Sequence, residues 1–302
     1  MTPVHGMPAS GGTSGDAQAA SAAGTHAPVS IVFADMDDTF LARDKTVPAG
    51  NLALLERMGK RGVPFVPCTG RVWSAVAGQV LEHAATRYVV ASDGAVVMDV
   101  SDAQSPRRLH LSALGRERAL ALYERVRELP VTFDAFWDGK IYVSRRRFEL
   151  MRGFDIPPYD RDVYLRYRTP VDMSTPQLLE SLPNVERLTI FTGDDDARAR
   201  AIEVVAADPT LHYTYSSARN LEVMDADTSK GAAVRWLCDY LGIPRTQSVG
   251  FGDSPNDLTM LAAVGDGVAV ANAYSEAKAA ATHVAPWTCD ESAVARYLEP
   301  LL

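Results

Sequence analysis

The sequence predicts an α/β protein in which a smaller α+β domain is inserted into an open parallel sheet. Towards both ends of the chain, short and continuously apolar runs alternate with stretches of helical periodicity. Such runs are typical of strands in a parallel sheet that helices cover on both faces. Between these regions the pattern changes to a hairpin signal, which belongs to an antiparallel sheet. We therefore expect a core of residues 29–93 and 212–302 and an inserted domain of residues 94–211.

The first core region contains three predicted strands and two predicted helices. The strands are residues 30–34, 63–66 and 88–91. One helix is expected to begin near Pro48 and to end at Gly62, because proline favours a helix start and glycine a helix end. Val72, Val76 and Val80 recur every fourth residue and predict the second helix.

The inserted region contains a predicted β-hairpin. Two strand-like runs, 131–137 and 140–144, flank Asp138-Gly139, which is a strong signal for a two-residue turn. Further strands are expected at residues 185–191 and 211–215, with a helix at 197–207 between them.

The first pattern returns near Leu221. A helix over residues 229–241 is expected to end at Gly242. It is followed by a strand at 248–251, a helix at 256–263 and a strand at 267–270.

Composition excludes several classes of protein. Of the 302 residues, 47% are apolar and 23% are charged, which excludes a fully disordered or collagen-like chain. No run approaches the roughly 18 consecutive apolar residues of a membrane span. The formal net charge of −8 argues against nucleic acid and anionic membranes as partners, although a small anionic substrate is compatible with it. Three cysteines are too few for a disulfide framework and indicate a reducing compartment, which is the cytoplasm.

Residues 1–28 are expected to form a disordered tail. They contain no Leu, Ile, Phe, Tyr or Trp, so they offer little apolar area to offset the entropy of ordering. They also lack the basic start and the apolar stretch of a secretory signal.

Three carboxylates, those of Asp35, Asp37 and Asp38, follow the first predicted strand. Carboxylates at one strand end repel each other unless a cation neutralises them, and a ligand set of oxygens alone suits Mg²⁺. Asp35 beside such an ion can act as a nucleophile toward phosphorus and form an aspartyl-phosphate, and Asp37 can serve as general acid and then as base. For two closely spaced aspartates alone, an acidic turn that caps a helix is the more common role.

Two further segments suit the binding of a phosphate. Thr69 and Gly70 follow the second strand, where a hydroxyl, a glycine main chain and helix N–H groups can bind phosphoryl oxygens. Arg71 either reaches the same phosphate or lies in solvent. Lys230 stands at a predicted helix start, whose N-terminal end is already positive, so that a local anion would stabilise it. Each segment alone also fits a structural role, as a helix cap or a surface lysine.

The fourth segment, Gly-Asp-Ser-Pro-Asn-Asp at 252–257, is the most specific. Asp253 can complete the metal shell, and Asp257 can act there as a direct ligand or as a partner of one. A glycine-proline turn with an aspartate cap is the structural alternative. All four segments fall at predicted strand ends or helix starts. Together they supply the nucleophile, proton donor, phosphate ligands and metal ligands of phosphoryl transfer.

These motifs, in this order, resemble those of the haloacid dehalogenase superfamily of phosphohydrolases. Residues 35–39 resemble its first motif, Asp-x-Asp-x-Thr, while Thr69 matches the second motif. Lys230 matches the third motif, and residues 252–257 match the fourth. The insertion between Thr69 and Lys230 resembles a C2-type cap, most like that of the Cof-type, subclass IIB branch. The resemblance implies a Rossmann-like core that carries such a cap.

The resemblance also implies roles for single residues. Asp35 would be the nucleophile and a metal ligand, and Asp37 would be the acid/base whose main-chain oxygen also binds Mg²⁺. The supporting residues would be Thr69, Lys230 and Asn256 for the phosphate and Asp253 and Asp257 for the metal shell.

Two positions depart from the family pattern. Family members often have glycine in place of Asp38, whose main-chain N–H would face the phosphate, so the Asp38 carboxylate must point away from it. The branch often has Asn-Gly-Ala where this chain has Asp-Gly-Ala at residues 93–95.

We therefore expect a Mg²⁺-dependent phosphatase that acts on a small phosphorylated metabolite, with a sugar phosphate as one option. The same residues suit a phosphomutase or phosphotransferase. Acidic clusters with a lysine also occur in phospho-accepting receiver or binding modules, although the insert and Asp37 argue against that role. In the insert, Tyr142 and residues 145–147 either contribute to specificity or form a packing aromatic and a solvated face. The sequence does not predict the oligomeric state.

Overall fold

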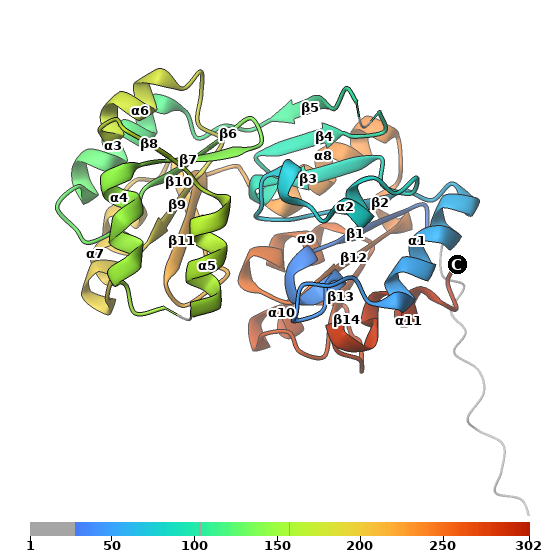
Figure 1. Cartoon of the computed structure of the whole chain (residues 1–302). Coiled ribbons are helices and arrows are strands. Elements are labelled where there is room, and N and C mark those ends of the chain that lie inside the picture. The colour runs from blue at the N-terminus through green and yellow to red at the C-terminus, as the bar shows by residue number, and fades with distance from the viewer. Residues whose placement is uncertain (1–27, 103, 157) are drawn as a thin grey trace, which may run out of the picture.

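The protein has two lobes joined by two short segments of chain (Figure 1). This computed structural model describes residues 28–302 except 103 and 157. The first lobe is built on a parallel sheet and the second on a mainly antiparallel one, in which only the edge pair of residues 140–144 and 169–171 is parallel. Apart from residue 28, the predicted tail lies outside the described residues.

The sheet of the first lobe confirms the predicted α/β core. Its strand order is β14-β13-β12-β1-β2, and every neighbouring pair is parallel. The strands are β1 (Ile31–Ala34), β2 (Phe65–Pro67), β12 (Ser248–Gly252), β13 (Asp266–Ala269) and β14 (His283–Val284).

Helices cover both faces of this sheet, which explains why its central strand is apolar throughout. In β1, Ile31 and Phe33 pack against α8 and α9, while Val32 and Ala34 lie in the cluster that contains α1 and α11. The bounds of these helices are α1 (Ala49–Arg61), α8 (Lys230–Leu241), α9 (Leu258–Ala263) and α11 (Ala293–Leu298). Gly62 and Gly242 end α1 and α8 in the left-handed conformation, as predicted.

The first lobe extends further along the chain than we expected. β3 (Tyr88–Ala91) continues the sheet through a parallel bridge between Cys68 and Val90. β4 (Val96–Asp99) and β5 (Arg107–Leu111) then add antiparallel strands. Val96 and Met98 of β4 are buried in the core of this lobe, so the insert begins only after β5.

The second lobe is a six-stranded sheet with the order β10-β11-β9-β6-β7-β8. Its strands are β6 (Asp134–Trp137), β7 (Lys140–Ser144), β8 (Thr169–Val171), β9 (Leu188–Phe191), β10 (Leu211–Thr214) and β11 (Asn220–Asp225). The hairpin of β6 and β7 is confirmed, with Asp138 and Gly139 both at positive φ in its turn. One face packs on α3 (Arg116–Val126), α6 (Thr175–Ser181) and α7 (Asp195–Ala206). The other face carries α4 (Arg145–Leu150) and α5 (Pro158–Tyr167).

The strand pairings place the insert at about residues 113–227 instead of 94–211. β10 and β11 pair antiparallel with each other and with β9, so the first pattern does not return near Leu221 but with α8. The two connections meet, because the hydroxyls of Ser112 and Thr228 lie 2.6 Å apart. The chain therefore passes between the lobes near residues 112 and 228.

The predicted helix through Val72, Val76 and Val80 is wrong. The chain instead forms a turn at Trp73–Ala75 and the short helix α2 (Gly78–Leu81), with extended backbone between them. The three valines are buried from two sides: Val72 packs against the second lobe and the other two against the first. Their spacing reflects two separate contacts, and the β-branched side chain favours extended backbone.

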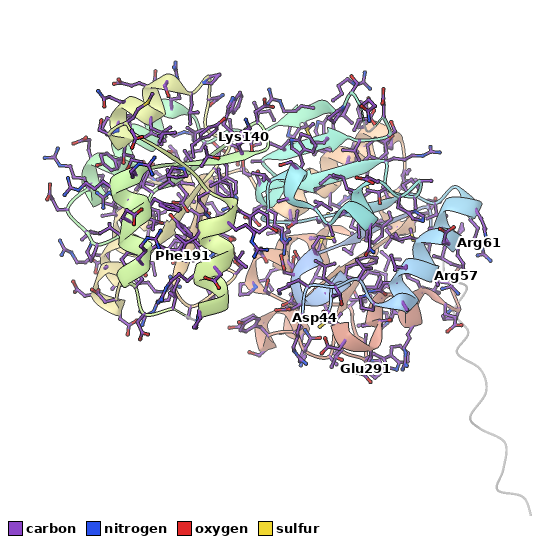
Figure 2. All side chains as sticks on the ribbon, viewed as in Figure 1. Asp44, Arg57, Arg61, Lys140, Phe191 and Glu291 are labelled. Atoms are coloured by element: carbon purple, nitrogen blue, oxygen red, sulfur yellow. The ribbon has the colours of Figure 1, made fainter. Side chains whose placement is uncertain are left out.

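Two close contacts hold parts of the structure together: the turn of the β6–β7 hairpin touches the first lobe, and α8 touches α9 within the first lobe. Ser74 Oγ of the first lobe donates at 2.6 Å to the carbonyl of Gly139 in this turn. The residue that follows the turn, Lys140, is labelled in Figure 2. In the first lobe, Gly231 lies so close to α9 that its N–H donates to Thr259 Oγ1 at 3.1 Å.

Within the described residues, no helix combines the length and the apolar character that a bilayer crossing requires.

Gly231→Ala is predicted to destabilise the first lobe. An added methyl would overlap the main chain of Thr259, so α8 and α9 would have to separate, at a cost of roughly 1–3 kcal/mol. Gly59→Ala in α1 is the matched control, since the nearest atom to its new methyl is 3.7 Å away. That change should stabilise by about 0.5–1 kcal/mol. Urea unfolding of both variants checks this, and equal stabilities would contradict the close approach of α8 and α9.

Candidate active site

The four segments singled out in the sequence meet at one edge of the parallel sheet. Asp35 follows β1, Thr69 follows β2, Asp253 follows β12, and Lys230 begins α8. The three residues after the strands line a cavity of about 420 Å³ that lies between the two lobes. The carboxyl ends of parallel strands meet at one edge, which is why residues far apart in the sequence converge here.

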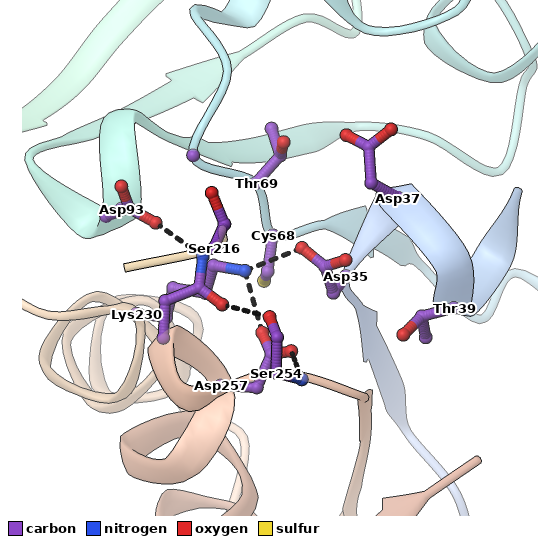
Figure 3. Close-up of polar contacts among 12 residues, drawn as sticks. Asp35, Asp37, Thr39, Cys68, Thr69, Asp93, Ser216, Lys230, Ser254 and Asp257 are labelled. Atoms are coloured by element: carbon purple, nitrogen blue, oxygen red, sulfur yellow. Dashed lines mark hydrogen bonds and ion pairs between the residues drawn. The ribbon is translucent and has the colours of Figure 1, made fainter. Parts of the chain in front are cut away.

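Lys230 is fully buried beneath this cavity. Its Nζ donates to Asp35 Oδ1 at 2.6 Å and to Asp257 Oδ1 at 2.7 Å (Figure 3). Ser229 caps the helix by accepting from the N–H of Ala232. A lysine in the first turn opposes the helix dipole, and the two carboxylates offset that conflict.

The buried cluster has more negative than positive groups. Ligand atoms of Asp35, Asp253 and Asp257 lie within 4.8 Å of one another, and Lys230 contacts two of the three. Burial raises the pKa of Asp35 well above its usual range, although Lys230 opposes this. Burial and the neighbouring Asp257 raise the pKa of Asp253 to about 7. A set of carboxylate oxygens that lacks positive charge fits a hard divalent cation.

Asp257 is engaged on both carboxylate oxygens. Besides Lys230, it accepts from the N–H of Asp253 at 2.9 Å and of Ser254 at 3.1 Å through Oδ2. This shapes the loop that presents Asp253, whose Oδ1 accepts from Thr39 Oγ1 at 2.7 Å. Asp257 therefore fits a supporting position better than that of a direct ligand.

Asp37 lies at the cavity wall and forms ion pairs with two basic side chains. Arg71 Nε and Nη2 donate to its two oxygens at 2.8 and 2.5 Å, and Lys45 Nζ lies at 3.4 Å. Burial alone would raise the pKa of Asp37, but Arg71 and then Lys45 lower it below its usual value. Arg71 thus neither lies free in solvent nor points at a separate anion.

Asp38 adopts positive φ, and its carboxylate accepts from Lys45 Nζ at 2.8 Å. Its main-chain oxygen accepts from Asn272 Nδ2 at 2.7 Å. The additional carboxylate therefore has its own cationic partner.

Thr69 and Gly70 follow β2 without opening a helix, contrary to the prediction. Thr69 is buried, and its Oγ1 accepts from the N–H of Arg71 at 3.1 Å, so its own hydrogen can be donated to the cavity. A methyl at Gly70 would lie 3.1 Å from both carboxylate oxygens of Asp93. Asn256 lines the cavity nearby, and its Nδ2 donates to Asp93 Oδ1 at 3.1 Å.

The second lobe supplies a wall that the sequence analysis did not identify. On β9 and β11, alternate residues face the helices and the cavity. The cavity-facing residues of these strands and of the segment before β9 are Arg187, Thr189, Phe191, Asn220 and Glu222. Period-two alternation was the available signal, but polar residues at alternate positions are also typical of a solvated face.

Arg187 joins the two lobes. Its Nε lies 3.3 Å from Asp93 Oδ2, with both side chains almost fully buried. It also donates to the main-chain oxygen of Gly70 and lies over the Phe136 ring, 3.9 Å from its centroid.

Glu222 is buried beside this pair. Burial, and next the charge of Asp93, raise the pKa of Glu222 to about 7, although Arg187 opposes the shift. Its Oε1 accepts from Ser216 Oγ at 2.9 Å and from Asn220 Nδ2 at 3.1 Å.

The other candidate specificity residues lie away from the cavity. Arg145 is exposed and paired with Asp172. Arg147 donates to main-chain carbonyls within the second lobe, and Tyr142 packs against its core. The structural alternatives for these residues therefore apply.

Comparison with known proteins gives the family. Residues 32–298 match the haloacid dehalogenase-like hydrolases. Phosphatase YwpJ of Bacillus subtilis is 27% identical, and the match covers 90% of this chain and 99% of its own. The HMP-PP phosphatase of Klebsiella pneumoniae is 25% identical, and the match covers 87% of this chain and 92% of its own. A haloacid dehalogenase-like hydrolase structure from B. subtilis superimposes with a TM-score of 0.77 at 23% identity, covering 91% of this chain and 100% of its own. The structure of a subclass IIB sugar phosphatase superimposes with a TM-score of 0.75 at 17% identity, also covering 91% of this chain and 100% of its own.

The chain belongs to the haloacid dehalogenase-like hydrolase family. Its relatives in that family are named as phosphatases, and the chain is a phosphoric monoester hydrolase. The resemblance drawn from the motifs is confirmed.

The Glu222 environment predicts a pH-dependent stability. Because its pKa is higher in the folded than in the unfolded chain, the carboxyl stabilises least once pH exceeds about 7. Glu222→Gln removes this titration, so its stability relative to the parent should rise between pH 5 and pH 8, by up to about 3 kcal/mol.

Urea unfolding at the two pH values measures this difference. Glu203→Gln, which removes an exposed carboxylate of α7, is the control and should show no such trend. A pH-independent difference for Glu222→Gln would show that the carboxyl titrates normally.

Proposed function

We propose that this chain is a Mg²⁺-dependent phosphatase that hydrolyses a small phosphorylated metabolite through an aspartyl-phosphate on Asp35. The observation that carries the proposal is the Asp35–Lys230–Asp257 cluster: Asp35 lines the floor of a cavity that a second lobe covers, and the fully buried Lys230 donates to it. Such a floor pairs a nucleophile with a fixed positive charge in a site of low dielectric.

The first step uses the carboxylate of Asp35. One of its oxygens attacks phosphorus, and the bond to the leaving oxygen breaks as Asp37 supplies a proton. In the second step Asp37 takes a proton from water, which hydrolyses the acyl phosphate and frees Asp35. Arg71 lowers the pKa of Asp37, so a substrate phosphate that draws Arg71 away would restore its proton affinity.

The phosphate itself is held by groups around Asp35. The proposed ligands are Lys230, the hydroxyl of Thr69, the main-chain N–H groups of Gly70 and Asp38, and the amide of Asn256. Asp38 adopts positive φ, and its carboxylate is bound by Lys45. Its N–H is therefore proposed to face the phosphate while its carboxylate points elsewhere.

The carboxylates suit Mg²⁺ as the cofactor. Asp35, Asp253 and the main-chain oxygen of Asp37 would hold it, with Asp257 in support, and the excess of buried negative charge supports this fit. When bound, Mg²⁺ supplies charge stabilisation at the transferring phosphoryl group.

The size of the cavity and the relatives support a small substrate. Relatives are named as phosphatases of HMP-PP and of 5-amino-6-(5-phospho-D-ribitylamino)uracil, and a solved relative as a sugar phosphatase. A sugar phosphate is therefore one option for this chain. We propose a cytoplasmic location, in keeping with three buried and unpaired cysteines.

Two alternatives use the same residues. A phosphomutase or phosphotransferase would pass the phosphoryl group to a second hydroxyl, and a receiver module would retain it on Asp35. Phosphate-release assays over a panel of phosphorylated metabolites with Mg²⁺ separate the three: free phosphate favours the phosphatase, a transferred group the mutase, and slow loss from Asp35 the receiver.

Asp35→Asn should abolish phosphate release while the fold is kept. The amide has nearly the same shape but is a far poorer nucleophile, and it contributes less negative charge to the cation site. Asp44→Asn, on an exposed residue nearby in the chain, removes the same charge and should be fully active. Ordinary turnover by Asp35→Asn, with deamidation excluded by mass spectrometry, would refute the covalent mechanism.

Asp37→Asn should slow alkyl phosphates more than aryl phosphates. Protonation matters most for a basic leaving alkoxide, and general-acid help is worth roughly 10²–10⁴-fold. The measurement is kcat/KM on an alkyl and on an aryl phosphate, because this constant includes departure of the leaving group and excludes the second step, which both substrates share. Equal losses on both would indicate that Asp37 only positions the other groups.

A further inference from the structure

The second lobe presents a polar wall to the cavity. Four residues form this wall, in the loop after β10 and at the start of β11: Ser216, Ser217, Asn220 and Glu222. The phosphate chemistry proposed above uses none of them.

Glu222 contains an acceptor without a partner. Its Oε1 is bound by Ser216 and Asn220, but its Oε2 is buried and has no hydrogen-bond partner among the described residues. The residue is only 4% exposed. A buried carboxylate oxygen without a donor is costly, so this arrangement is expected only where something else completes it.

Strand geometry fixes the direction of this side chain. Leu221 and Val223, its neighbours on β11, lie in the hydrophobic core against the helices. Since successive residues of a strand point to opposite faces, Glu222 lies on the cavity face, where it lines the cavity.

Neither neighbouring charge satisfies Glu222. Arg187 forms an ion pair with Asp93 and donates to Thr189 Oγ1 at 2.8 Å and to the main-chain oxygen of Gly70. Its buried Nε makes no hydrogen bond among the described residues, and Arg187 forms no ion pair with Glu222 there. Asp93, like Glu222, is an acid and has no hydrogen to donate when ionised. The three charged groups together have one negative charge in excess, so the missing partner is a hydrogen-bond donor.

We propose that Glu222 is a specificity-determining residue whose Oε2 accepts a hydrogen bond from a hydroxyl or protonated amine on the leaving group of the substrate. This inference rests on the proposed phosphatase function and adds a substrate class to it. Esters of polyols or amino-polyols complete the polar wall, whereas alkyl esters leave Oε2 unpaired. A leaving group with a second anionic end meets the negative charge of Glu222 and is disfavoured.

Pairs of substrates with equal chain length test this proposal. We compare ribitol 5-phosphate with n-pentyl phosphate, and sorbitol 6-phosphate with n-hexyl phosphate, at pH 8 with Mg²⁺ and the full chain. For the parent, kcat/KM should favour the polyol of at least one pair by on the order of tenfold or more, because a lost hydrogen bond to a charged group is worth that much.

Glu222→Gln is the decisive variant. The amide oxygen can keep the hydrogen bonds from Ser216 and Asn220, while an NH₂ donor replaces the Oε2 acceptor. A substrate hydroxyl can then only accept from this amide, in an uncharged hydrogen bond that is weaker than one donated to a carboxylate. The polyol preference should fall on the order of tenfold, with the alkyl phosphates within about twofold of the parent. Glu222→Met, which offers neither acceptor nor donor, should remove the preference as well, and Glu203→Gln should keep it.

The outcomes distinguish this inference from the function on which it rests. A parent ratio near one in both pairs overturns it, as does a ratio that neither variant changes. An equal loss on polyol and alkyl substrates also overturns it, because that result indicates a purely structural role. Acetyl phosphate is the reference substrate: if the parent shows no turnover of it that depends on Asp35, the phosphatase proposal fails as well.

Discussion

The burial of Lys230 between Asp35 and Asp257 is the interaction on which the active-site geometry depends. A lysine with no exposed surface is stable only if carboxylates surround it, and those carboxylates then require a fixed backbone around them. Asp257 meets this need by binding two N–H groups of its own loop. The strand ends, the start of α8 and the loop after β12 are therefore held as one unit, and the carboxylates that exceed the single lysine leave room for a cation.

The second lobe combines two tasks in one sheet. Leu188 and Ile190 of β9 build its hydrophobic core, while Thr189 and Phe191 between them line the cavity. Every second residue is thus free to vary with the substrate without loss of core packing. Arg187 connects this wall to the first lobe through Asp93, so the proposed recognition surface and the proposed phosphate ligands share one network of charge.

The sequence predicted the first lobe and the positions of its acidic residues better than it predicted the second lobe. Asp35 and Asp253 follow continuously apolar strands, and a local pattern is enough to place them at strand ends. Glu222 and Arg187 follow no such rule, because a polar residue in an alternating strand faces either solvent or a cavity, and only tertiary packing decides which. The stripe of Val72, Val76 and Val80 failed for the same reason, since its members are buried by two different lobes. The insert boundary failed because β10 and β11 resemble core strands locally and differ only in their partners.

The hydrogen bond between Ser112 and Thr228 has a consequence for how such a protein arises and changes. The point at which the chain leaves the first lobe and the point at which it returns are joined by one hydrogen bond. If the second lobe were removed, almost no extra chain would be needed to connect these two points. A segment whose two ends coincide can be gained, lost or exchanged as a module without disturbing its host. The proposed recognition wall is therefore carried on a separable part of the chain, whereas the proposed nucleophile and metal ligands belong to the lobe that remains.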